Sequence, residues 1–82
     1  LWGADFSETR CPQVQLRDAD LSGAVLVRAD LTGANLIKAV LCGVNLQAAN
    51  LSQALLIEAD LRPGSDQQTN LRGANLQGAN LS

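Results

Sequence analysis

The sequence offers few groups that could carry out acid–base, nucleophilic or metal chemistry. It contains no histidine, so the commonest general base and the commonest metal ligand are both missing. Its recurring aspartates are spaced at multiples of five residues, which indicates a repeat rather than a catalytic pair: Asp5, Asp20, Asp30 and Asp60. We therefore expect a protein that is not an enzyme, with no catalytic, metal-binding or cofactor-binding residues and no cofactor.

The two cysteines do not form a metal motif. Cys11 takes a position that is usually leucine, where it would act as a small hydrophobic residue. Cys42 directly follows a leucine and would lie on the outside. In the coil inferred below, the two fall on opposite sides, whereas a disulfide needs Cα atoms within about 7 Å. We expect no disulfide within the chain.

Residues 62–68, Arg-Pro-Gly-Ser-Asp-Gln-Gln, interrupt the repeat but keep its phase. Asp66 takes a leucine position, where burial of an unpaired carboxylate is costly. The stretch should therefore loop out, or form a distorted side with Asp66 turned to solvent. If the whole unit loops out, pairing beyond Leu71 shifts by one side. Because loops on rigid scaffolds often carry binding residues, Arg62 and Asp66 are candidate loop contacts.

The element that positions these residues is a leucine at every fifth position from Leu16 to Leu61. A helix turns about 100° per residue, so leucines five apart would scatter around it. A strand alternates its faces with period two, so they would point up and down in turn. The spacing fits a chain that bends once per repeat, so that four such sides close a square coil. Successive coils would stack about 4.8 Å apart through backbone hydrogen bonds.

The other repeat positions support this coil when each leucine is called position i. Position i−2 is small and should point inward with the leucine, because a narrow interior has no room for a second large side chain. Position i−1 is Asn or Asp in ten of sixteen repeats, and these residues bond readily to nearby backbone. Glycine recurs at i+2, where a tight turn needs it: Gly23, Gly33, Gly43, Gly73 and Gly78.

Units such as Ala29–Gly33 and Ala74–Gly78 resemble the A(D/N)LXX signature of pentapeptide repeat proteins. The resemblance implies an all-β fold, a right-handed quadrilateral β-helix with four pentapeptides per coil and about four coils here. The chain would be a single domain, residues 1–82. Its expected parts are an irregular N-terminal end at 1–13, regular coils at 14–61, a loop or distorted repeat at 62–68, and final repeats at 69–82.

One group of apolar residues is expected on the outside of the coil. Ile37 and Ile57 are twenty residues apart and would stack, with Leu55 beside them at a usually polar position. Apolar patches often mark partner surfaces. However, β-branched residues also simply suit a β ladder. Both interpretations stay open, and Ile37, Leu55 and Ile57 are the candidate interaction surface.

Composition narrows the classes of function. The net charge of −2 and the pI near 4.7 argue against binding nucleic acid, which needs clustered Lys and Arg. No apolar run approaches the roughly 18 residues of a membrane span, so we expect no membrane partner. We expect a cytoplasmic location, with a processed or exported product as the alternative.

The function expected from these features is a non-catalytic structural or protein–protein interaction module that forms part of a larger protein. Its protein partner is not identified by the sequence. The open coil edge at Asn80-Leu81-Ser82 favours either continuation into further domains or an end-to-end homodimer. The alternative function is DNA mimicry that modulates a DNA-binding enzyme such as a topoisomerase. The resemblance implies this alternative because some pentapeptide repeat proteins act in this way. The short rod and the basic residues among the acids count against it.

Overall fold

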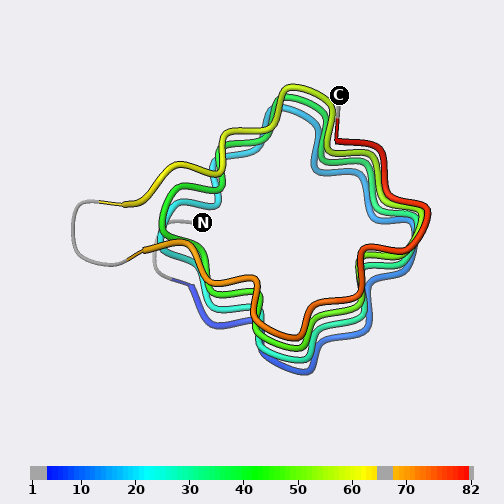
Figure 1. Ribbon diagram of the computed structural model, residues 1–82, viewed down its shortest axis with the longest axis horizontal. Helices are drawn as coiled ribbons and strands as arrows, with labels where there is room; N and C mark the ends of the chain where they lie inside the picture. The colour runs from blue at the N-terminus through cyan, green and yellow to red at the C-terminus, as the bar shows by residue number, and fades with distance from the viewer. Residues whose placement is uncertain (1–3, 65–67, 82) are drawn as a thin grey trace.

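The computed structural model describes residues 4–64 and 68–81 of the chain. These residues wind around a central axis as a four-sided coil, whose levels lie directly over one another (Figure 1). The described residues form no helix and no extended strand; they pair instead through single-residue β-bridges at every fifth position. In particular, no helix among them is long and apolar enough to cross a membrane.

The bridges are parallel and fix the register between coils. From Asp5 with Val25 to Val40 with Asp60, they join position i−1 of one repeat to the residue twenty further on. From Leu16 to Leu56, the N–H of each leucine of the five-residue grid donates to a carbonyl of the next coil, as from Leu21 to Val40 at 2.7 Å. A register of twenty residues with a bend every five gives four sides, called walls below. The predicted square coil is therefore present.

Except at the break after Asp60, each described wall ends in a tight turn that begins at the leucine position. Leu21 C=O accepts a hydrogen bond from Ala24 N–H at 3.0 Å, and Gly23 between them has φ of +69°. A positive φ at the third residue is the mark of a type II turn, which favours glycine. The predicted turn glycines are confirmed. Among the described residues, eight others adopt the same conformation without being glycine: Glu8, Gln13, Asp18, Arg28, Lys38, Ala48, Gln53 and Glu58.

The Asn or Asp that precedes the leucine stabilises this turn from outside. Asp30 Oδ1 accepts a hydrogen bond from Thr32 N–H at 3.1 Å, and Asn35 Oδ1 accepts one from Ile37 N–H at 3.1 Å. The same bond recurs on every wall, so the predicted side-chain to backbone bonding is confirmed. This bond satisfies the N–H of the residue after the leucine, which does not take part in the hydrogen-bond ladder between coils.

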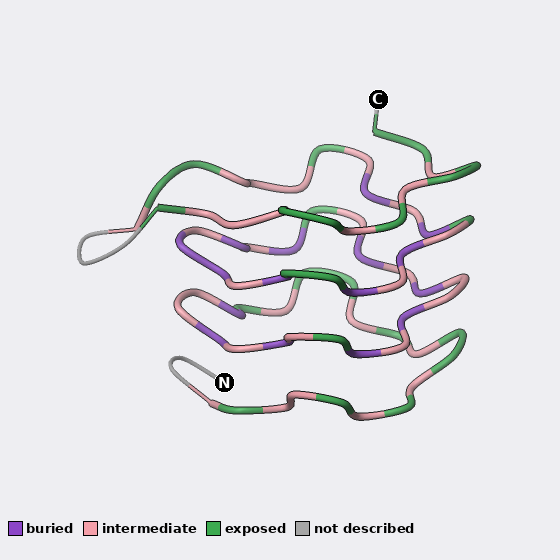
Figure 2. Ribbon diagram, turned by 60° about the horizontal axis from the view of Figure 1, so that its bottom comes forward, coloured by how far each residue is buried: buried purple, intermediate pink, exposed green. Residues whose placement is uncertain are grey.

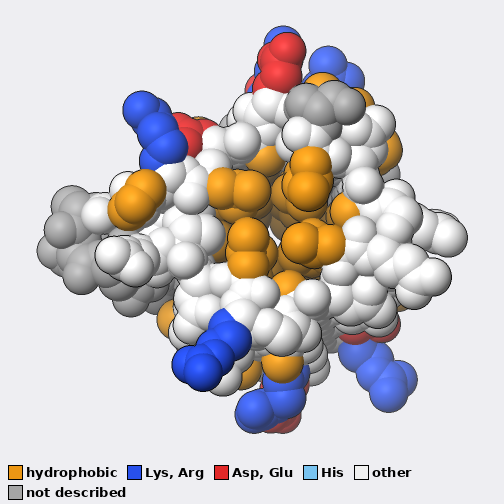
Figure 3. Space-filling view, in the orientation of Figure 1, with side chains coloured by type: hydrophobic (Ala, Val, Ile, Leu, Met, Phe, Trp, Pro, Cys, Tyr) orange, Lys and Arg blue, Asp and Glu red, His pale blue; other side chains and the backbone are white. Residues whose placement is uncertain are grey.

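The interior consists of leucines and of the small residues two positions before them. Leu41, Leu51 and Ala34 are fully enclosed, and no polar or charged residue in the described ranges is buried. Buried residues lie in the middle levels, whereas the first and last levels are half-buried or exposed (Figure 2). Seen along the axis, apolar side chains gather at the centre and charged ones project around the rim (Figure 3).

The register changes once, between Asp60 and Asn70. Asn45 pairs with Asn70, Asn50 with Asn75 and Leu55 with Asn80, which are twenty-five residues apart instead of twenty. The chain thus uses ten residues there to advance by one wall. The described flanks, 61–64 and 68–69, contain no turn and run outward from the coil (Figure 1).

Candidate interaction surface

The apolar group of Ile37, Leu55 and Ile57 lies on one wall. Asp18 N–H donates to Ile37 C=O at 3.0 Å and Lys38 N–H donates to Ile57 C=O at 2.9 Å, so the two isoleucines occupy successive levels of one column. Leu55 lies in the neighbouring column, bridged to Asn35 and Asn80. All three side chains are half-buried. The wall therefore offers them only partly to a partner.

Charged residues stack beside this group without pairing to one another in the described ranges. Asp18, Lys38 and Glu58 stack in the adjacent turn column, but Lys38 forms no ion pair with either acid in the described ranges. Instead, Asp18 Oδ2 lies 3.8 Å from Arg17 Nε. The pairing between coils occurs on another wall, where Arg28 Nε donates to Glu8 Oε2 at 3.1 Å. The lysine side chain is thus left pointing into solvent near the apolar group.

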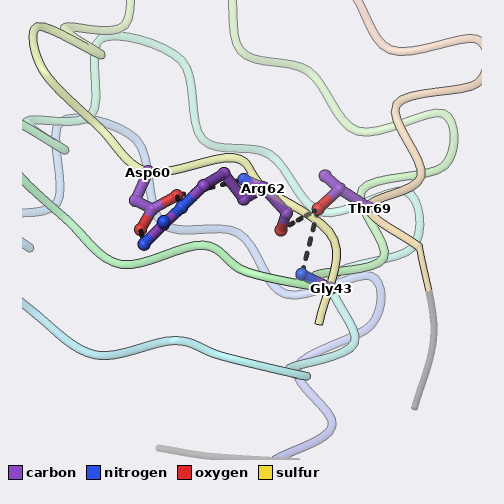
Figure 4. Close-up of polar contacts among 4 residues, drawn as sticks. All are labelled: Gly43, Asp60, Arg62 and Thr69. Atoms are coloured by element: carbon purple, nitrogen blue, oxygen red, sulfur yellow. Dashed lines mark hydrogen bonds and ion pairs between the residues drawn. The ribbon is translucent and has the colours of Figure 1, made fainter. Parts of the chain in front are cut away.

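The second candidate region is the break at 62–68, where Arg62 folds back on Asp60. Its Nε donates to Oδ1 at 2.9 Å and its Nη2 to Oδ2 at 2.7 Å (Figure 4). This two-pronged hydrogen bond holds the pKa of the Asp60 carboxyl well below its usual range. The Arg62 guanidinium stays accessible, with 81% of its side chain exposed. Asp66, the other predicted loop contact, lies outside the described residues.

A threonine closes the base of this break. Thr69 Oγ1 accepts a hydrogen bond from Gly43 N–H at 2.9 Å and donates one to Arg62 C=O at 3.0 Å (Figure 4). It joins the residues before and after the skipped unit to the coil beneath. Thr69 was not among the candidate residues predicted from the sequence. Its signal was a hydroxyl residue at an i−2 position that is usually alanine.

The two cysteines are both free and half-buried. Cys11 packs against the core, as its leucine position predicts. Cys42 lies on the outer wall near Asp60 and Arg62. Burial raises the pKa of its thiol, and the Asp60 carboxylate raises it further. A raised thiol pKa leaves little thiolate at neutral pH, which makes Cys42 a poor nucleophile.

Nothing in the described residues assembles into a reaction centre. They contain no group of three or more His, Cys, Asp or Glu side chains that could hold a metal ion. Three of the outer carboxyls have lowered pKa values because they accept hydrogen bonds from Ser or Thr two residues later: Asp5, Asp20 and Asp30. Since these carboxylates serve their own turns, the features left for recognition are the surfaces of the outer walls.

Comparisons with known proteins agree with this architecture. The chain matches the family model of pentapeptide repeats in eight copies, over residues 1–36, 24–62 and 67–82. It also matches the crystal structure of HetL, a pentapeptide repeat protein involved in heterocyst differentiation regulation from the cyanobacterium Nostoc sp. strain PCC 7120. That match has a TM-score of 0.99 and 57% sequence identity, and it covers 100% of this chain and 35% of HetL.

A second solved structure is more distant. Rfr23, a pentapeptide repeat protein from the cyanobacterium Cyanothece 51142, matches with a TM-score of 0.62 and 33% identity over 98% of this chain and 51% of its own. The chain thus spans about a third of the length of HetL and about half that of Rfr23. A comparison with curated proteins found no match.

Proposed function

The chain belongs to the pentapeptide repeat family, and we propose that it is a non-catalytic section of a regulatory protein that binds a protein partner through its outer walls. Proteins of this family form right-handed quadrilateral β-helices. The column Asp5–Val25–Asn45–Asn70 supports about four coils for this section. The observation that carries the regulatory proposal is the match to HetL, at 57% identity over the whole chain.

The composition of the interior supports a non-catalytic role. Catalysis needs a protected site with a nucleophile, a base or a metal, whereas the core here is made of Leu, Ala and Val. The matching family model is not that of a catalytic family. What varies along the chain, and could therefore specify a partner, is the set of side chains on the walls.

We assign the partner contact to the wall that carries Ile37, Leu55 and Ile57. Ile37 and Ile57 follow one another in one column and Leu55 lies in the neighbouring column of the same wall. Lys38 directly follows Ile37 and forms no ion pair with its stacked acids in the described part of the chain. An apolar centre with a cation at its edge suits a protein surface with an apolar residue near a carboxylate. Arg62 would contribute at the edge of an adjoining wall, and Asp66 stays a candidate contact from the sequence alone.

The decisive experiment is a segment exchange. Residues 1–82 replace the matching third of HetL, and the chimera is tested for its effect on heterocyst differentiation in Nostoc. We expect the chimera to keep the regulatory effect. We expect Ile37→Thr with Ile57→Thr to remove that effect, because threonine keeps the branched shape that the ladder needs but loses the apolar surface.

The matched control is Val27→Thr, which makes the same kind of change at the same repeat position on a different wall. It should retain the effect. Circular dichroism melting of all variants separates loss of contact from loss of folding. Equal loss of regulation in the double variant and in Val27→Thr, with both folded, would contradict the assignment of this wall.

The duplex-mimic alternative has less support. The section is only 19 Å in its shortest extent, which lies along the coil axis (Figure 1). It would cover about six base pairs at 3.4 Å each. Its acidic groups are interspersed with Arg10, Arg28, Lys38 and Arg72. A gyrase supercoiling assay tests it: potent inhibition by the folded chain would favour mimicry over the interaction module.

A further inference from the structure

The turns of the coil differ in whether the N–H of position i+1 has a partner. Where position i−1 of a described turn is Asn or Asp, its side-chain oxygen accepts a hydrogen bond from this N–H, as Asn35 does from Ile37 at 3.1 Å. Four residues at i+1 follow a different residue type at i−1, and their N–H forms no hydrogen bond within the described ranges: Arg17, Val27, Cys42 and Ile57. We call these N–H groups open. Because backbone polar groups need a partner, each open N–H is a donor for water or for another molecule.

The open N–H of Ile57 lies on the wall assigned above to the protein partner. It is open because Leu55 takes position i−1, and a leucine side chain has no oxygen that could accept the bond. One level before, the N–H of Ile37 meets the side chain of Asn35 on the outside of the same wall. The N–H of Ile57 therefore faces out of the wall beside the Leu55 side chain, and not toward either end of the coil.

The residue stacked beside Ile57 favours a negatively charged group on the partner. Lys38 N–H donates to Ile57 C=O at 2.9 Å, so the lysine lies one level from the open N–H, and it forms no ion pair among the described residues. At Val27, whose N–H is also open, the same place holds an acid, Glu8. A donor with a cation nearby suits a carboxylate better than a neutral oxygen, because charge-assisted hydrogen bonds are shorter and stronger.

We propose that the protein partner places the carboxylate of one Asp or Glu side chain here, where it accepts hydrogen bonds from Ile57 N–H and Lys38 Nζ. An apolar neighbour of that acid packs on Leu55. The inference rests on the proposed function, because it specifies the partner of the same wall. The partner's carboxylate takes the place that the chain's own Asn or Asp has in the other turns. Glu58, which directly follows Ile57, repels further negative charge, so the site selects a single acid and not an acidic run.

Hydrogen exchange in the wild-type chain tests whether the N–H of Ile57 is open. Ile37 is the matched control, because both isoleucines follow a leucine and have the same intrinsic exchange rate, and both occupy position i+1 of one column. Exchange followed by NMR should be about fivefold faster at Ile57, since the side-chain hydrogen bond protects only Ile37. Equal rates at the two amides would contradict the proposal.

A peptide titration tests the preference for a carboxylate. The probe is acetyl-leucyl-aspartyl-amide, which carries one carboxylate, and the control is the asparaginyl peptide. We expect the probe to shift the amide resonance of Ile57 but not that of Val27, and to bind about threefold more tightly than the control. Lys38→Gln should weaken binding of the probe about threefold, and Glu58→Gln should strengthen it by a similar factor. Equal binding of the two peptides, or no shift at Ile57, would overturn the proposal.

Substitutions at Leu55 test the same contact in the regulatory protein. Leu55→Asn supplies the side-chain oxygen that caps Ile57 N–H from within the chain. Leu55→Gln is the matched control, because Gln15, at the same repeat position of this column, leaves Arg17 N–H open. Both variants lose the leucine, so only the N–H distinguishes them. In the HetL chimera, Leu55→Asn should lose more of the regulatory effect than Leu55→Gln.

The outcomes separate this inference from the proposed function. If the wild-type chimera regulates and both Leu55 variants are folded and regulate equally, the carboxylate contact is wrong while the proposed function stands. If the wild-type chimera does not regulate, the proposed function fails, and the peptide titration still decides whether this point of the wall binds a carboxylate.

Discussion

The middle coils and the last coil repeat the same five-residue pattern, yet they are not equivalent. Leu41 and Leu51 are fully enclosed, whereas Leu71 and Leu76 are only partly buried although they occupy the same repeat position. The turns are alike in both regions, and Asn75 N–H of the last coil still donates to Ala49 C=O of the coil before it. The difference is that a middle leucine has a coil on each side. In a solenoid, the contribution of a residue to stability thus depends on the neighbouring coils more than on its own repeat.

The sharpest test of this comparison is a leucine truncation in each region. We expect Leu41→Ala to destabilise the chain by about 3 kcal/mol, because it leaves a cavity in an enclosed core. Leu76→Ala should cost only about 1 kcal/mol, since its side chain is partly exposed and gives up less buried surface. Urea unfolding followed by circular dichroism measures both. Equal losses would mean that the coils contribute uniformly along the chain.

Turn glycines provide a second test. An alanine at Gly33, with φ of +68°, would place its Cβ 3.2 Å from Gln13 Cγ of the preceding coil. At Gly73, with φ of +72°, the nearest atoms would be 3.8 Å away, an ordinary contact. Gly73→Ala should therefore cost about 1 kcal/mol from backbone strain alone.

Gly33→Ala should cost about 2 kcal/mol, because the same backbone strain is joined by the close contact with Gln13. The double variant Gly33→Ala with Gln13→Ala should recover the difference, as judged from urea midpoints. If the double variant is no more stable than Gly33→Ala, the contact does not matter and only φ does.

The base of the break supplies a smaller effect. Thr69→Val removes the hydroxyl that bonds Gly43 N–H and Arg62 C=O, and we expect a loss of about 1 kcal/mol. Gly43 N–H also donates to Arg62 C=O at 3.1 Å, which limits the loss. Thr9→Val is the control at the same repeat position, since no hydrogen bond from the Thr9 hydroxyl exists among the described residues. If Thr9→Val lost as much stability as Thr69→Val, the hydrogen bonds of Thr69 would not be the cause of the loss.

Lowering the pH should produce the smallest loss of stability per residue, and this loss is shared among several aspartates. The pKa values of Asp5, Asp20, Asp30 and Asp60 are lowered in the folded chain, so folding favours their charged forms. Their contribution is present above about pH 4, near the unfolded pKa of 3.8, and is lost as the pH falls through the folded values. Asparagine at the same repeat position makes the same bond without titrating, as Asn50 does with Ser52.

The variant Asp30→Asn should therefore unfold in urea with a weaker pH dependence between pH 5 and pH 2, while its stability at pH 7 changes little. A steeper acid loss in Asp30→Asn than in the wild type would mean that folding favours the protonated form of Asp30 instead.

Much of this fold follows from the sequence because its determinants are local and repeated. The leucine spacing predicted which side chains point inward, and Gly23 and Asn35 predicted the turn and its supporting bond. Features that depend on particular side chains meeting across coils were not predictable in this way. Lys38 stacks between two acids but pairs with neither in the described ranges. The hydrogen bonds of Thr69 could not be predicted because they depend on Arg62 C=O and Gly43 N–H, which the register change brings near its hydroxyl.

Cys11 was correctly predicted as a residue that packs against the core. In contrast, the positive φ of residues such as Glu58 and Lys38 is imposed by the coil and not by their own preference. Local chemistry thus predicts the repeat, whereas its exceptions arise from contacts between coils.

The register change between Asp60 and Asn70 affects how the fold tolerates inserted residues. Everywhere else a single inserted residue would move each later leucine out of phase with the core. Between Arg62 and Thr69 the number of residues does not determine where Leu71 falls, because Thr69 and Arg62 close the coil across the gap. Doubling a six-residue connection there would cost only about 0.6 kcal/mol in closure entropy. This one junction could therefore accept a foreign peptide, displayed at the rim while the coils on either side stay in step.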